Sequence, residues 1–256
     1  RFHRAGGTCM IVIHKLSKHY NIEISNAEDL KRSMEKTVEF SEEINKETPV
    51  QAYPVVGVHP AEVVELQEEY GTSKTTDMVK EALNHASEMY EENKIVGIGE
   101  IGRPHYEVSD EQWELSIEMM KYGMKLAAEK DFPVQLHTES MEEEGILEIG
   151  EIADEFGLSK VIKHFSPPFI KVSEEAGVFP SILAKEENID KALSEGTRFL
   201  METDYLDDLD RPGAVLGAKN VPSKTKAMIG EGVMSEEEAY IIHKENVESL
   251  YDVELE

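Results

Sequence analysis

Residues 94–106 read KIVGIGEIGRPHY, an apolar run spaced by glycines and interrupted by a single glutamate, Glu100. Val and Ile without polar alternation are typical of a strand that is covered on both faces, as in a parallel sheet. A carboxylate in such a strand is costly unless another group compensates its charge. The stretch therefore predicts a buried strand and leaves open which group lies next to Glu100.

Six further short apolar runs alternate with amphipathic helical patterns, which predicts repeated βα units around a parallel sheet. They are TCMIVIH (8–14), VQAYPVVGVH (50–59), PVQLH (133–137), KVIKHF (160–165), AGVFPSI (176–182) and TRFLMETD (197–204). An open doubly wound sheet also alternates in this way, but no nucleotide-binding glycine fingerprint follows the first run. We therefore expect residues 1–256 to form a single α/β domain, a TIM-type barrel with seven strands visible and the first strand missing.

Several helix boundaries have recognisable signals. Three capping boxes, a serine followed three residues later by Glu or Gln, predict helix starts at Ser25, Ser109 and Ser235. After Ser109, apolar residues recur at helical spacing and are expected to face the sheet. They are Trp113, Ile117, Met120, Met124 and Ala127.

Composition limits the possible partners. The 256 residues include 53 acidic and 26 basic ones, a net charge of −27, which argues against a broad basic face for nucleic acid. A small or single-stranded nucleic-acid substrate remains possible if metal ions contact its phosphates.

No apolar run approaches the ~20 residues of a membrane span, so no membrane association is expected. The single cysteine excludes an internal disulfide and fits a cytoplasmic location.

Residues able to bind metal recur at the ends of the predicted strands: His59, Glu100, His137, His164 and Asp204. In a barrel, the carboxyl ends of all strands meet at one mouth, and these residue types bind divalent transition metals. Taken singly, each has an ordinary alternative: a hydrogen-bonded core histidine, a solvated glutamate, an aspartate that caps a turn. Their recurrence on separate strands favours a shared metal site.

The same stretches resemble a known family. GVHP (57–60), IGEIG (98–102), PVQLH, KHFS (163–166) and ETD (202–204), followed by NVP (220–222) and ENVESLY (245–251), occur in the order found in TatD-type metal-dependent hydrolases of the amidohydrolase superfamily. The resemblance covers the chain from about residue 50 onward. A glutamate at the end of the third run distinguishes it from the phosphotriesterase-like branch, which has a modified lysine there.

This resemblance implies a TIM-type barrel with two divalent ions, such as Zn, Mn, Mg or Ni. Glu100 would bridge both ions, and His137 and His164 would bind one of them. Asp204 would bind the other ion and orient or deprotonate the attacking water, which makes Glu100 and Asp204 the catalytic candidates. Members of the family are typically nucleases that release nucleotides from DNA ends.

The sequence departs from the family pattern in three places. The His-x-His pair of the family's first strand is absent; FHR (2–4) lacks the spacing. We therefore expect a ligand-bearing strand to precede Arg1, and at most one ion to be well held without it. RPHY (103–106) replaces Leu-Asp-Tyr after GEIG, and HFSPP (164–168) replaces His-Cys-Phe-Ser-Gly. Both changes lie where substrate would bind.

Three further residues are substrate-binding candidates. Arg103 is able to clamp a phosphate, or alternatively to pair with one of the many acidic side chains. His105 is placed to hydrogen-bond the phosphate or the leaving group. His59 is expected to contact substrate or a carboxylate rather than a metal.

Three functional hypotheses follow. The first is a metal-dependent hydrolase that cleaves phosphodiester bonds of nucleic acid. The second is a metal-dependent hydrolase of a small lactone, amide or phosphoester. The third is an inactive barrel that acts as a binding or scaffold protein, for which the absent His-x-His pair is the main support.

Overall fold

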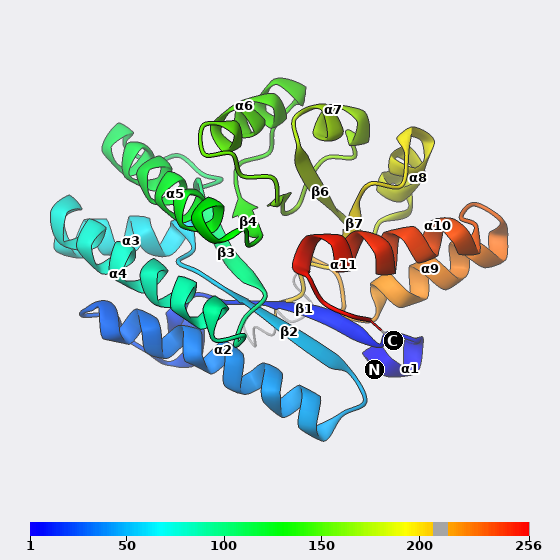
Figure 1. Ribbon diagram of the computed structural model, residues 1–256, viewed down its shortest axis with the longest axis horizontal. Helices are drawn as coiled ribbons and strands as arrows, with labels where there is room; N and C mark the ends of the chain where they lie inside the picture. Colours follow the sequence, from blue (N-terminus) through cyan, green and yellow to red (C-terminus); the bar gives the residue numbers. More distant parts are fainter. Residues whose placement is uncertain (207–214, 256) are drawn as a thin grey trace.

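A computed structural model describes residues 1–206 and 215–255. Seven parallel strands stand in the sheet in chain order, and the sheet curls into a half-barrel with helices outside it (Figure 1). This confirms the predicted TIM-type α/β fold with seven strands. The strands are β1 (Cys9–Ile13), β2 (Gln51–Val56), β3 (Gly97–Gly102), β4 (Val134–His137), β5 (Val161–Lys163), β6 (Val178–Leu183) and β7 (Leu200–Glu202).

Helices connect successive strands and cover the outer face of the sheet (Figure 1). The helices of this layer are α2 (Ala27–Glu47), α3 (Pro60–Tyr70), α4 (Thr72–Glu91), α5 (Asp110–Lys130), α6 (Glu143–Asp154), α7 (Ile170–Glu175) and α8 (Glu186–Glu195). The remaining elements are α1 (Phe2–Ala5), the 3-10 turn η1 (Ser17–Tyr20), α9 (Asn220–Glu231), α10 (Glu236–Tyr240), the π-helical turn η2 (Ile241–Glu245) and α11 (Asn246–Tyr251). Within the described ranges, no helix combines the length and the apolarity that crossing a bilayer requires.

Two of the three predicted capping boxes are confirmed. Ser109 caps α5 and Ser235 caps α10, each with its reciprocal partner three residues on. The capping box predicted at Ser25 is wrong by one residue, because Asn26 caps α2 and accepts the N–H of Glu28. Ser25 instead donates its N–H and its hydroxyl to the carboxylate of Asp29, which stands at the third helical position.

The main core lies between the sheet and the outer helices. Ile98 and Ile101 of β3 pack there with Met120, Met124 and Ala127 of α5, all buried as the helical spacing predicted. Trp113 and Ile117, at the start of the same helix, are only partly buried. The outward-facing isoleucines leave Glu100 free to face the inside of the half-barrel.

A second apolar cluster fills the inner face. Val55, Ile162, Phe179 and Leu200 come from four strands and pack against Leu250 and Tyr251 of α11. The last helix therefore closes against the concave side of the sheet, and it brings a tyrosine hydroxyl into the interior.

The end of β3 approaches β4 unusually closely. The pairing register shifts between Ile98 and Ile101, after which Gly102 pairs with His137. A Cβ at Gly99 would lie 2.7 Å from the Cβ of Gln135, so only glycine allows this approach. The glycines of the GIGEIG stretch thus place Glu100 beside the end of β4.

Candidate metal centre

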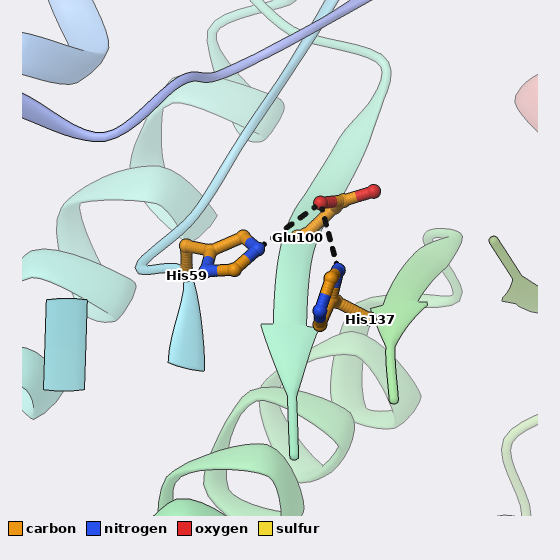
Figure 2. A group of neighbouring side chains, drawn as sticks. All are labelled: His59, Glu100 and His137. Carbon is orange, nitrogen blue, oxygen red and sulfur yellow. Dashed lines mark ion pairs between the residues drawn. The ribbon is translucent and has the colours of Figure 1, made fainter. Parts of the chain in front are cut away.

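Glu100 lies among three histidines from three different strand ends. Its carboxylate oxygens lie 3.6 Å from Nε2 of His59, 3.5 Å from Nδ1 of His137 and 3.4 Å from Nδ1 of His164. In Figure 2, the rings of His59 and His137 lie next to each other and converge on the same carboxylate oxygen of the glutamate. Ring nitrogens from three strand ends thus surround the buried carboxylate of Glu100.

His59 is held by the helix that it begins. It is the N-cap of α3, and its Nδ1 accepts the N–H of Ala61 at 3.0 Å, while Pro60 takes the first helical position. Burial lowers the pKa of His59 to about 3, against the opposing effect of Glu100, so the ring is neutral. With Nδ1 occupied as an acceptor, the ring proton is on Nε2 and faces Glu100.

His137 has an unused nitrogen. Its Nε2 lies 2.7 Å from Nδ1 of His105, whereas its Nδ1 is buried and has no hydrogen-bond partner. A buried imidazole nitrogen without a partner, aimed at a carboxylate, is the arrangement expected of a metal ligand. Ligand atoms of His59, Glu100 and His137 lie within 4.8 Å of one another. Because the Nε2 of His59 carries a proton, Glu100 and the Nδ1 of His137 are the two groups of this trio that fit a divalent metal.

His164 lies between three carboxylates. Its Nδ1 lies 3.0 Å from Glu202 and 3.4 Å from Glu100, and its Nε2 lies 3.7 Å from Asp204. Burial opposes the charged imidazolium, but Glu100, Glu202 and Asp204 outweigh it and raise the pKa of His164 to about 10. The protonated His164 therefore places a positive charge among these carboxylates.

Two carboxylates of the cluster differ in protonation. Burial alone would raise the pKa of Glu100, but His164, His137 and His59 lower it well below the usual range. Partial burial raises the pKa of Asp204 to about 6, with His164 acting against it and Glu202 adding to it. Glu100 is therefore a permanent anion, whereas Asp204 exchanges its proton near neutral pH.

Glu202 is a site residue that the sequence reasoning did not assign. Besides its contact with His164, it accepts the N–H of Phe165 at 3.0 Å and the hydroxyl of Ser181. It thereby fixes the segment that follows β5 to the end of β7. Its sequence signal is the first residue of the ETD stretch, two positions before the predicted ligand Asp204.

Residues 1–252 match the family described as TatD related DNase. The chain belongs to the TatD family. A protein of Methanocaldococcus jannaschii, described as uncharacterized protein MJ1127, is 45% identical over 258 residues, covering 100% of this chain and 89% of the relative. Members of this family are metal-dependent hydrolases, and this chain is one of them.

Solved structures share the fold of this TatD-family chain. The TatD homologue YJJV from Escherichia coli K12 has a TM-score of 0.66 at 20% identity, covering 99% of this chain and 90% of that one. A TatD family hydrolase from Entamoeba histolytica gives 0.59 at 15% identity, covering 97% and 86%. The organophosphorus hydrolase from Deinococcus radiodurans gives 0.63 at 12% identity, covering 96% and 92%.

Arg103 directly follows β3 of this TatD-family barrel, and its side chain is buried. Its side chain is 2% exposed, and it donates two hydrogen bonds to Glu139, at 2.6 and 3.1 Å, and one to Glu148 at 2.9 Å. Its guanidinium also lies over the ring of Trp113 at 5.3 Å. The phosphate-clamp interpretation is corrected accordingly, because the side chain is buried against two acids, which was the second alternative.

Two hydrogen bonds inside the barrel connect α11 to Glu100, and sequence reasoning missed both. Gln135 donates from Nε2 to Glu100 at 3.4 Å, and the hydroxyl of Tyr251 donates to the Oε1 of Gln135 at 3.3 Å. Burial raises the pKa of Tyr251, so its hydroxyl stays protonated and remains a donor. Gln135 and Tyr251 are positioning residues for Glu100, since they act on it from the apolar interior.

Proposed function

We propose that this chain hydrolyses phosphodiester bonds of nucleic acid with the help of divalent metal ions. One observation carries the proposal: a glutamate shared by His137 and His164, with the Nδ1 of His137 lacking any other partner. In the proposal, Glu100, His137 and His164 hold one ion, and Glu100 and Asp204 contribute to a second. A bound divalent ion activates water and stabilises negative charge on the oxygens of a phosphodiester.

Asp204 is the proposed general base. Its carboxylate follows the end of β7, 3.7 Å from His164, and burial raises its pKa in the metal-free protein to about 6. The carboxylate is ionised at neutral pH, and a neighbouring divalent ion would lower its pKa further. Asp204 therefore takes the proton of the attacking water, while Glu100 stays ionised and holds its neighbours in place.

His105 is proposed to contact the substrate phosphate. If the Nε2–H of His137 donates to the Nδ1 of His105, the neutral ring of His105 carries its proton on Nε2. Burial lowers the pKa of His105, which favours that neutral form. The exposed ring then offers one N–H donor to a phosphate oxygen at the mouth.

Nucleic acid is the proposed substrate because the matching family is described as a DNase. The net charge of −27 favours short, single-stranded or terminal segments over long duplexes, which require many cationic contacts. These two arguments together limit the proposal to nucleotide release from unpaired ends.

Turnover of a labelled single-stranded oligonucleotide by the full chain tests this proposal, with Mn²⁺, Mg²⁺, Zn²⁺ and Ni²⁺ supplied in turn. We expect shortened products, their loss with a chelator, and their loss in Glu100→Gln. Hydrolysis of a lactone or a small phosphoester with no oligonucleotide cleavage would replace the proposed substrate. Absence of turnover with every metal and substrate would favour a binding protein.

A further inference from the structure

Exposed aromatic side chains are concentrated around the candidate site. Of the five aromatic residues with exposed side chains in the described part of the chain, three directly follow site residues: Tyr106, Phe165 and Tyr205. Their exposed fractions are 43%, 44% and 47%. Single exposed aromatics are common on protein surfaces, but three that follow the alternate strands β3, β5 and β7 beside one site require an explanation.

Two of these rings continue the histidine cluster. The ring centroid of Tyr106 lies 5.4 Å from that of His105, edge to face, and His105 lies 4.9 Å from His137. On the other side, His137 lies 5.8 Å from His164, and His164 lies 5.9 Å from Phe165. The five rings form one continuous arc, with an exposed aromatic side chain at each end.

The backbone holds Phe165 in this place. Its φ of +49° is unusual for a bulky residue, and its N–H is bound by Glu202. Burying the ring would have been the ordinary use of a phenylalanine. Instead, the strand end fixes it next to His164 with nearly half of its surface in solvent, as a preformed contact surface.

Charge indicates which ligand suits this surface. With a net charge of −27, the chain offers little electrostatic attraction for the phosphodiester backbone of nucleic acid. Binding energy must therefore come from another part of the substrate. Unpaired nucleobases stack on exposed aromatic rings without regard to sequence. Each stacked base is worth about 5-fold to 150-fold in affinity.

We infer that Tyr106 and Phe165 are base-stacking platforms that bind unpaired nucleobases on the two sides of the reacting phosphate, with Tyr205 extending the surface beyond Asp204. This inference rests on the proposed nuclease function. Duplex ends must then fray before they bind, because a paired base has its faces covered by its neighbours. Binding also depends only weakly on salt, because few phosphates are neutralised.

Binding of a fluorescein-labelled oligothymidylate, followed by anisotropy with a chelator present, tests the inference without turnover. The comparison ligand is the same oligonucleotide with abasic residues in place of the internal thymidines. We expect the full chain to prefer the thymidine form at least 5-fold. Tyr106→Ala and Phe165→Ala should each lose about 5-fold or more for that form and little for the abasic form. Phe165→Trp should retain the preference for the thymidine form that Phe165→Ala loses, because a tryptophan ring also stacks on bases.

Matched controls are two exposed aromatics away from the site, Phe40 of α2 and Tyr240 of α10, at 54% and 53% exposure. Phe40→Ala and Tyr240→Ala should leave both affinities unchanged.

Equal losses for the thymidine and abasic forms, or no loss in the Tyr106 and Phe165 variants, would overturn the inference. Base-dependent binding without nucleotide release would overturn the nuclease proposal alone. Nucleotide release unaffected by these variants would overturn stacking alone.

Discussion

The Nδ1 of His137 lies 3.5 Å from the Oε2 of Glu100, and no hydrogen bond satisfies that nitrogen. A proton on Nδ1 at this distance would make only a poor hydrogen bond, while its lone pair would face an anion. Either state is costly in a largely buried site unless a cation lies between the two groups. This pair of atoms is therefore the part of the site that most needs a metal.

Substitution of His137 should weaken metal binding much more than substitution of His59. His137→Asn should weaken binding of Zn²⁺ or Mn²⁺ by about 100-fold or more, because it removes the unpartnered nitrogen. His59→Asn keeps an N-cap side chain for α3 and should change affinity by about 10-fold or less, because the Nε2 of His59 carries a proton. Isothermal titration calorimetry of the full chain measures both. Equal losses would mean that His59 is itself a ligand.

Metal affinity should rise with pH. The pKa of His164, raised to about 10, means that an ion must displace a proton from this ring. Between about pH 7 and 9 we expect close to a tenfold gain in affinity per pH unit, and release of one proton in calorimetry with buffers of different ionisation enthalpy. An affinity that does not change over this range would contradict the placement of His164 among the ligands.

The same pKa shift predicts how pH affects the metal-free protein. Because the pKa of His164 is raised from 6.5 to about 10, its ion pairs stabilise the fold fully below pH 6.5, and this stabilisation is lost as pH rises through about 10. Urea unfolding at several pH values, with chelator present, should show the decline in wild type. His164→Asn should show a smaller decline over the same interval.

Gln135 and Tyr251 should act on catalysis through Glu100. Tyr251→Phe should cost about 1 kcal/mol of unfolding free energy, and Gln135→Leu about 1–3 kcal/mol, because each leaves a buried polar partner unsatisfied. Both should lower kcat more than they change KM, since Glu100 loses its orientation. Tyr122→Phe removes an exposed hydrogen bond to Asn84 and is the control. Loss of stability with unchanged kcat would make the two residues purely structural.

Arg103 should prove structural. Arg103→Lys loses the two-fold contact with Glu139 and the stacking on Trp113, and should lower the unfolding free energy by about 1–3 kcal/mol. KM for an oligonucleotide should change by less than about threefold, since the side chain is buried and paired with Glu139 and Glu148. A large rise in KM with unchanged stability would restore the phosphate-clamp interpretation.

The parts of this site that the sequence predicts are those with a local signal. Each strand end is predicted from an apolar run that carries a ligand-type residue at or near its end, which indicates His59, Glu100, His137, His164 and Asp204 together. The order of strands follows from the chain order, because βα units place successive parallel strands side by side.

The parts that escaped prediction depend on distant contacts or on backbone detail. Gln135 and Tyr251 lie 116 residues apart, and neither has a neighbour in sequence that indicates their hydrogen bond. Arg103 follows Gly102, whose φ of +143° no sequence pattern specifies, and its acidic partners Glu139 and Glu148 lie 36 and 45 residues further along the chain. At Ser25 the spacing of a capping box is present, but Asn26, one residue later, caps α2 instead.

Anomalous diffraction from crystals of the full chain grown with Mn²⁺ or Zn²⁺ tests the central claim most directly. The account predicts one strong peak about 2.0–2.3 Å from a carboxylate oxygen of Glu100, from the Nδ1 of His137 and from a ring nitrogen of His164. A peak bound by other residues, or no peak at saturating metal, would contradict it.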